Sequence, residues 1–214
     1  MIVGIIGLGQ IGAAVAANVA PTGTRVTVAS RTPERADQLA AQLGDGVRAA
    51  SIEDTIKDNA IVVLAVPYPE LEKLITAHQD LLAGKIVVDP SNPITPDESG
   101  ELVRLVPDNE TAAQHVASWL PAAAHHVKTF STLGAEALRD NAHSEPPVAL
   151  FLAADSAEAA DGVADLVRKM GYDPISVGGL DQAKRIEANA AGDLHQFAGL
   201  NGRLINGDEA RSLV

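Results

Sequence analysis

The stretch Ile2-Val3-Gly4-Ile5-Ile6-Gly7-Leu8-Gly9-Gln10-Ile11-Gly12 decides the fold of this chain. Its first five residues predict a short buried strand, and the small apolar residues after Gly12 predict a helix. In this order, Gly7 permits a tight turn, Gly9 lets backbone N–H groups approach a pyrophosphate, and Gly12 lets the helix pack closely on the strand. The helix N-terminus directs its positive dipole end at the phosphates. The stretch predicts a dinucleotide-binding turn, and the alternative is an Ala/Gly-rich turn without a ligand.

The composition narrows the class of protein. The chain has 214 residues, of which 46% are hydrophobic and 3% aromatic, so we expect an aliphatic core. It has no cysteine, which excludes disulfides, thiolate metal sites and a cysteine nucleophile, and no metal-binding motif occurs. A net charge of −12 argues against a nucleic-acid or anionic-membrane partner. The first strand begins at residue 2 and no apolar run reaches membrane-spanning length, so we expect no signal peptide and a cytoplasmic protein.

Strands and helices alternate along the chain, which predicts parallel βαβ units. Apolar and β-branched runs predict further strands over 25–30, 47–50, 60–66, 85–89, 126–130, 148–153 and 174–177. Apolar residues at helical spacing predict helices between these strands, and a last helix over 180–197. The predicted fold class is α/β, a Rossmann-type doubly wound parallel sheet. We expect an NADP-binding domain over 1–130 and a smaller C-terminal α+β unit over 131–214.

The end of the second predicted strand indicates which dinucleotide would bind. A turn that prefers NAD carries an acidic residue there, which accepts hydrogen bonds from the ribose 2′-hydroxyl. This chain has Ser30, Arg31 and Thr32 instead, and Arg35 follows Arg31 by four residues. Hydroxyl and guanidinium groups would bind a 2′-phosphate, so the sequence favours NADP over NAD. The alternative is that both arginines are ordinary solvated charges at the start of a helix.

Ligands of an open parallel sheet lie at the carboxyl ends of its strands. These ends are mostly apolar or neutral, which suits hydride transfer and does not suit hydrolysis. The candidate residues there are Ala65, Val66, Pro67, Tyr68, Ser91, Asn92, Pro93, Ser131, Thr132 and Leu133. Asp89 is either a general base or a cap of the following turn. His125 and His126 would face opposite sides of a strand, and His126 is either a proton donor or a structural residue.

Several motifs together resemble the F420-dependent NADP oxidoreductases and the related NADPH-binding domain of the membrane ferric reductases called STEAP. They are Ile-Ile-Gly7-Leu-Gly-Gln-Ile-Gly12, Ala-Ser30-Arg31-Thr-Pro-Glu-Arg35, Leu-Ala65-Val-Pro67-Tyr, Val-Val-Asp89-Pro-Ser-Asn92-Pro93, Lys128-Thr-Phe-Ser-Thr132-Leu-Gly134-Ala-Glu and Gly178-Gly-Leu-Asp-Gln-Ala183. The resemblance implies hydride exchange between NADPH and a deazaflavin that lies on the nicotinamide, with no obligatory side-chain acid or base. It also implies a homodimer and a small C-terminal unit that covers the pocket.

The resemblance extends the expected site. Cofactor contacts are expected from Gly7 to Gly12, from Ser30, Arg31, Thr32 and Arg35, and from the ends of the later strands, and the substrate pocket would include Tyr68, Thr132, Leu133 and Ala135. The chain departs from archaeal members in two places. They open with Gly-Gly-Thr-Gly, where this chain has Gly7-Leu-Gly-Gln, and they place a histidine beside the flavin, where Ser131 stands here.

Three hypotheses follow. The leading one is an NADPH-dependent reductase whose second substrate is a flat redox carrier, F420 or a flavin. The second is a reductase of a small carbonyl or imine, which needs a proton donor such as Tyr68 or His126. The third is a redox sensor that binds NADPH and has no second substrate.

Overall fold

The computed structural model describes residues 2–188 and 193–214, and its centre is one eight-stranded sheet. The strands lie in the order β10-β9-β8-β5-β4-β1-β2-β3, and all neighbours are parallel except β8 and β9. Their bounds are β1 (Ile2–Ile6), β2 (Arg25–Ala29), β3 (Val47–Ala49), β4 (Ile61–Leu64), β5 (Ile86–Asp89), β8 (His125–Thr129), β9 (Ala149–Ala154) and β10 (Asp173–Gly178). The Rossmann-type α/β fold expected from the sequence is confirmed.

The direction of chain winding reverses beside β1. From β1 the chain adds β2 and then β3 on one side, and it crosses to add β4 and then β5 on the other side. The connections that leave β1 and β4 therefore diverge at the carboxyl edge of the sheet. A crevice opens between them, and such a switch point is where open α/β sheets bind their ligands.

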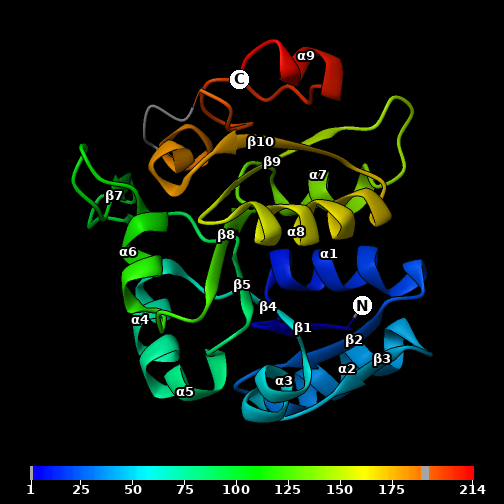
Figure 1. Cartoon of the computed structure of the whole chain (residues 1–214). Helices are drawn as coiled ribbons and strands as arrows, with labels where there is room; N and C mark the ends of the chain where they lie inside the picture. Colours follow the sequence, from blue (N-terminus) through cyan, green and yellow to red (C-terminus); the bar gives the residue numbers. More distant parts are fainter. Residues whose placement is uncertain (1, 189–192) are drawn as a thin grey trace.

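Helices cover both faces of the sheet (Figure 1). One face carries α1 (Gln10–Val19), α2 (Pro33–Leu43), α7 (Ala135–Asp140) and α8 (Ala157–Lys169), and the other carries α3 (Ile52–Asp58), α4 (Tyr68–Ala77), α5 (Gln79–Leu82) and α6 (Ala112–Trp119). Strand residues alternate between the two layers: Val3 and Ile5 join the first cluster and Ile6 the second. In the part of the chain that is described, every helix is too short or too polar to cross a membrane.

The residues after 130 extend the same sheet. Strand β9 runs antiparallel to β8, because the connection through the short helix α7 starts and ends at the same edge. Helix α8 then carries the chain back across the sheet, so that β10 is parallel to β9. A third apolar cluster joins these two strands to η2 (Leu180–Ile186) and α9 (Gly207–Arg211). The domain boundary at residue 130 stays a prediction.

Three parts of the structure differ from the sequence prediction: the C-terminal helix, a hairpin, and α9, which follows the last predicted helix. The prediction of one helix over 180–197 is wrong. A 3-10 helix ends at Ile186, Glu187 is extended, and 193–200 forms turns. Residues 189–192 lie outside the described residues. Glu187 leaves the helix because its buried carboxylate accepts from Ala113 N at 3.1 Å and lies 3.3 Å from Arg104 Nη2. The hairpin of β6 (Ile94–Pro96) and β7 (Leu102–Arg104) was missed, because three-residue strands are too short to show a period.

A fully buried ion pair joins the ends of β5 and β8. Lys128 Nζ lies 2.7 Å from Asp89 Oδ2 and also donates to the carbonyl of Ser91, while Ser91 N donates to Asp89 Oδ1 at 2.7 Å. Burial alone would raise the pKa of Asp89, but the charge of Lys128 and these hydrogen bonds outweigh it and hold that pKa below its usual value. The pair thus fixes the turn after β5.

We predict that Lys128→Met lowers the free energy of unfolding by about 3–5 kcal/mol at neutral pH, because it leaves the Asp89 carboxylate buried without a cation. The pKa of Asp89 in the variant should rise above its unfolded value. Stability lost at neutral pH should then return in part as the pH falls towards that value, because the carboxyl becomes protonated. Urea denaturation at several pH values measures this difference from the wild type.

The double variant Asp89→Asn with Lys128→Met is the matched control, because it removes both charges and keeps the acceptor for Ser91 N. It should recover at least half of the lost stability. Equal losses for the single and double variants would contradict an electrostatic role for the pair.

Candidate functional site

Two glycines let helix α1 begin close to the strand ends. Gly7 has a φ of +92°, and a Cβ there would lie 2.3 Å from the Ala65 carbonyl oxygen. A Cβ on Gly12 would lie 1.9 Å from the Gly7 carbonyl oxygen. Backbone hydrogen bonds from Gly7 N to Ala29 O and from Ala65 N to Ile6 O hold the three strand ends in register. Both positions therefore require glycine for the fold itself.

Gly9 is different, because nothing in the described structure lies within 4 Å of a Cβ built there. Its φ of −73° is also open to other residues. Gly9 precedes α1, whose first turn has no acidic residue and whose first N–H groups have no partners within the helix. The space over Gly9 thus suits a group that approaches the backbone closely and carries negative charge, as a pyrophosphate does.

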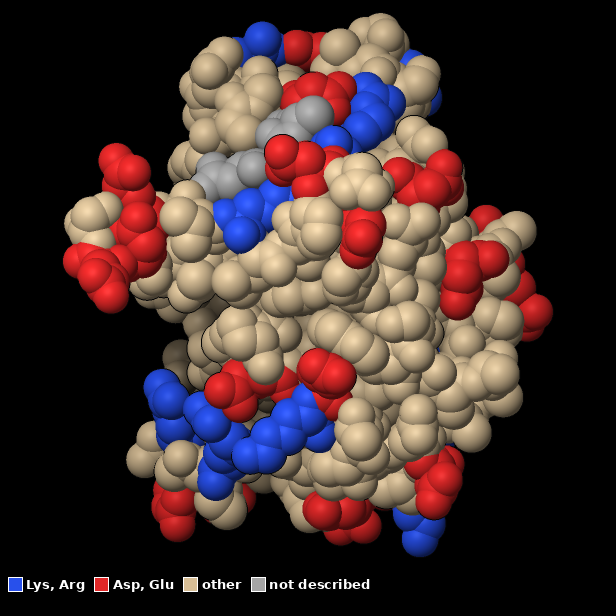
Figure 2. Space-filling model, turned by 90° about the vertical axis from the view of Figure 1, so that its left-hand side faces the viewer, with Lys and Arg blue, Asp and Glu red and all other residues tan. Residues whose placement is uncertain are grey.

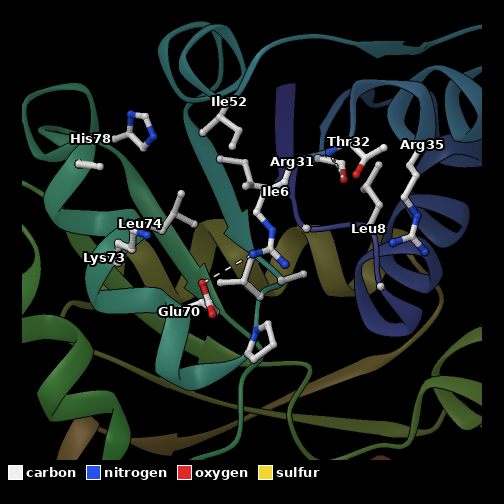
Figure 3. Close-up of a pocket in the computed structure, with 17 residues that line it drawn as sticks. Ile6, Leu8, Arg31, Thr32, Arg35, Ile52, Glu70, Lys73, Leu74 and His78 are labelled. Carbon is white, nitrogen blue, oxygen red and sulfur yellow. Dashed lines mark hydrogen bonds and ion pairs between the residues drawn. The ribbon is translucent and has the colours of Figure 1, made fainter.

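A crevice of about 440 Å³ opens at the carboxyl ends of β1, β2 and β4 (Figure 3). Ten residues expected from the sequence to contact the cofactor line it: Gly7, Leu8, Gly9, Ser30, Arg31, Thr32, Arg35, Ala65, Val66 and Pro67. They come from the glycine turn, the β2–α2 connection and the β4–α4 connection. The structure therefore brings the two halves of the predicted nucleotide site into one cavity.

The crevice mouth carries several cations. Arg31 lines it from the β2–α2 connection, Arg35 from the first turn of α2, and Lys73 from α4 (Figure 3). On the face shown in Figure 2, Lys and Arg side chains gather low on the molecule beside Asp and Glu side chains. Because the whole chain has a net charge of −12, a local grouping of cations is a feature that suits a phosphorylated ligand.

One side of the crevice was missed from the sequence. Helix α4 lines it with Glu70, Lys73, Leu74 and Ala77, joined by Ile52 and His78. The four α4 residues follow the spacing i, i+3, i+4 and i+7, which places them on one helix face. This spacing was a usable signal, but the apolar residues of the same helix pointed only to the core.

The other predicted cofactor contacts lie outside this cavity. Gln10 lines a second cavity between α1, α2 and α7, while Ile11 and Gly12 lie within α1. Ala135, predicted for the substrate pocket, lines the same second cavity. Asn92, in the turn Ser91-Asn92-Pro93, donates to Ser131 O at 3.0 Å and accepts from Ala188 N at 2.8 Å. Asn92 thus holds the end of β8 and the C-terminal segment together, and its cofactor contact stays a prediction.

The candidate residues after β8, which are Ser131 as a possible catalytic residue and Thr132 and Leu133 for the substrate pocket, are buried. Ser131, Thr132 and Leu133 follow β8 closely, and Gln196 N donates to Thr132 O at 2.9 Å. The Gln196 side chain also accepts from Gly134 N at 2.9 Å. The C-terminal segment therefore lies directly on this loop, and the roles of these residues in substrate binding stay predictions.

Two candidate proton donors lie inside the protein. His126 is 0% exposed, as expected for the opposite face from the half-exposed His125, and burial lowers the pKa of His126 to about 4. Burial, with the carboxylates of Glu187 and Asp89, raises the pKa of Tyr68 to about 12. At neutral pH both side chains are therefore uncharged.

Compared with known proteins, the fold and the crevice are similar to those of Rossmann-type NADP-dependent oxidoreductases. Residues 2–93 match the family described as NADP oxidoreductase, coenzyme F420-dependent, and the resemblance seen in the sequence is confirmed. The F420-dependent NADP reductase of Methanothermobacter marburgensis is 26% identical over 193 residues, which cover 85% of each chain. A hypothetical protein from Sinorhizobium meliloti has a crystal structure that superposes with a TM-score of 0.79 at 27% identity, covering 89% of this chain and 91% of that one.

The chain is also similar to part of larger proteins. The metalloreductase STEAP3 of Rattus norvegicus is 30% identical over 186 residues, which cover 87% of this chain but only 36% of that protein. The chain thus spans about a third of the length of the curated STEAP relatives that it matches.

Gly9→Ala and Gly12→Ala should separate ligand binding from folding. We predict that Gly9→Ala keeps the thermal stability of the wild type but weakens NADPH binding by about tenfold or more, because the added methyl group fills only the ligand space. Gly12→Ala should lower the free energy of unfolding by about 3 kcal/mol or more, because its methyl group overlaps backbone. Calorimetry with NADPH and thermal unfolding of both variants measure these effects. Equal loss of stability in both would contradict the assignment of Gly9 to the ligand.

Proposed function

We propose that the chain exchanges hydride between NADP(H) and a flat redox carrier, F420 or a flavin. The observation that carries this proposal is the crevice that joins an open glycine turn to Arg31 and Arg35, which follow β2. The turn would hold the pyrophosphate, and Ser30, Thr32 and the arginines would hold a 2′-phosphate. When bound, NADPH supplies the hydride.

Several features favour a carrier as the second substrate. The β4–α4 side of the crevice presents Ala65, Val66 and Pro67, which exclude water and hold a ring without donating a proton. His126 is fully buried and neutral, and Tyr68 holds its proton tightly, so neither suits a general acid. The similar protein from Methanothermobacter marburgensis is named an F420-dependent NADP reductase. Reduction of a small carbonyl or imine, and NADPH sensing without turnover, are the competing outcomes.

The proposal also includes a cover over the carrier, a homodimer and a cytoplasmic location. The segment after residue 130 would cover the carrier, because Gln196 already lies against the loop after β8. A homodimer and a cytoplasmic location stay predictions, and light scattering of the purified protein tests the first of them.

We predict that Arg31→Ala weakens NADPH binding by about tenfold or more, because it removes hydrogen bonds from a charged donor to the 2′-phosphate. NADH affinity should change little, because NADH has no such phosphate. Isothermal titration calorimetry with both nucleotides measures the difference. Arg25→Ala is the matched control: it removes the same charge at the amino end of β2, at the opposite edge of the sheet. Equal losses for NADPH and NADH in Arg31→Ala would remove the assignment to NADP.

His126→Ala should leave turnover within about threefold of the wild type if a carrier accepts the hydride directly, because no general acid is then lost. The assay follows the absorbance of NADPH mixed with F420 or with FMN. A loss of about a hundredfold or more in a folded variant would favour the carbonyl or imine reductase. NADPH binding without turnover on either carrier would favour the sensor.

A further inference from the structure

An acidic side chain lies opposite the proposed phosphate-binding arginine. Glu70, in the first turn of α4, faces Arg31 across the crevice, and Arg31 Nη1 lies 3.9 Å from Glu70 Oε2 (Figure 3). Both side chains reach solvent, with 86% of Arg31 and 50% of Glu70 exposed. Among the described residues that line the crevice, Glu70 carries the one carboxylate.

The placement of Glu70 is set by its helix. Glu70 and Lys73 are three residues apart on the face of α4 that lines the crevice, whereas Glu72 lies on the same helix outside the lining. Of the crevice cations, Arg31 has this carboxylate within 3.9 Å, and Lys73 lies one turn further along the same helix face. A ligand phosphate that binds Arg31 must compete with Glu70 for the same guanidinium.

We propose that Glu70 is a specificity-determining residue that limits the preference of the crevice for NADPH over NADH. This inference rests on the proposed binding of NADP(H). A 2′-phosphate carries a charge near −2, and the carboxylate both repels that charge and neutralises Arg31. NADH has a ribose hydroxyl at this position, which a carboxylate does not repel and to which it can offer an acceptor.

The solvent exposure of the Arg31–Glu70 pair determines how strongly Glu70 lowers NADPH affinity. An exposed ion pair is worth little, so the phosphate displaces Glu70 from Arg31 at small cost. Glu70 therefore reduces NADPH affinity without preventing binding, and it acts through charge rather than through shape.

The test is Glu70→Gln, which keeps the size of the side chain and removes its charge. Calorimetry should show NADPH binding about two- to fivefold tighter than in the wild type, with NADH affinity unchanged. The gain should shrink as salt is added, because salt screens exposed charges. Glu72→Gln is the matched control, since it makes the same change in net charge on the same helix outside the crevice, and it should alter neither affinity.

The outcomes separate this inference from the proposed function. If the wild type gives no heat with NADPH, the proposed function fails and the inference fails with it. If the wild type binds NADPH but Glu70→Gln leaves the ratio of the two affinities unchanged, the inference alone is overturned. An equal gain in Glu72→Gln would also overturn it, because net charge and not position would then explain the change.

Discussion

The structure depends on a contact between backbones that has no side chains in it. At Gly12 the start of α1 lies so close to the end of β1 that any Cβ would overlap the Gly7 carbonyl. Gly7 in turn lies against the Ala65 carbonyl at the end of β4. This contact places the N-terminus of α1 at the point where the chain reverses its winding. The free N–H groups of the helix and the crevice therefore coincide.

Buried charges organise the far side of the site. Asp89 and Lys128 join the ends of β5 and β8, and Glu187 pairs with Arg104 and holds an N–H group at the start of α6. Such pairs contribute little net stability, but each is costly to break because the remaining partner would be an uncompensated charge. They therefore hold loops and the C-terminal segment in one arrangement, where apolar contacts alone would permit several.

The crevice combines opposite charges at its mouth and nearly none at its base. Arg31 faces the Glu70 carboxylate and Arg35 and Lys73 line the same crevice, while the strand ends below them are apolar or small. A phosphate outside and a neutral ring inside fit this distribution. The same layout explains how one site could favour a phosphorylated cofactor and still release it, because the exposed charges at the mouth are weak in solvent.

Local sequence determined the elements that depend on neighbours along the chain. The glycine spacing predicted the turn before α1, the β-branched runs predicted the strands of the sheet, and Ser30 to Arg35 predicted the cationic end of the crevice. These elements could be predicted because each depends on the backbone conformation or the hydrophobic period of a single segment. Tertiary structure alone decided the rest: the antiparallel pairing of β9, the end of the 3-10 helix at Ile186, and Glu70 opposite Arg31. Each depends on a contact with a segment that is distant in the sequence. The residue pattern of one segment does not indicate which distant segment it will contact.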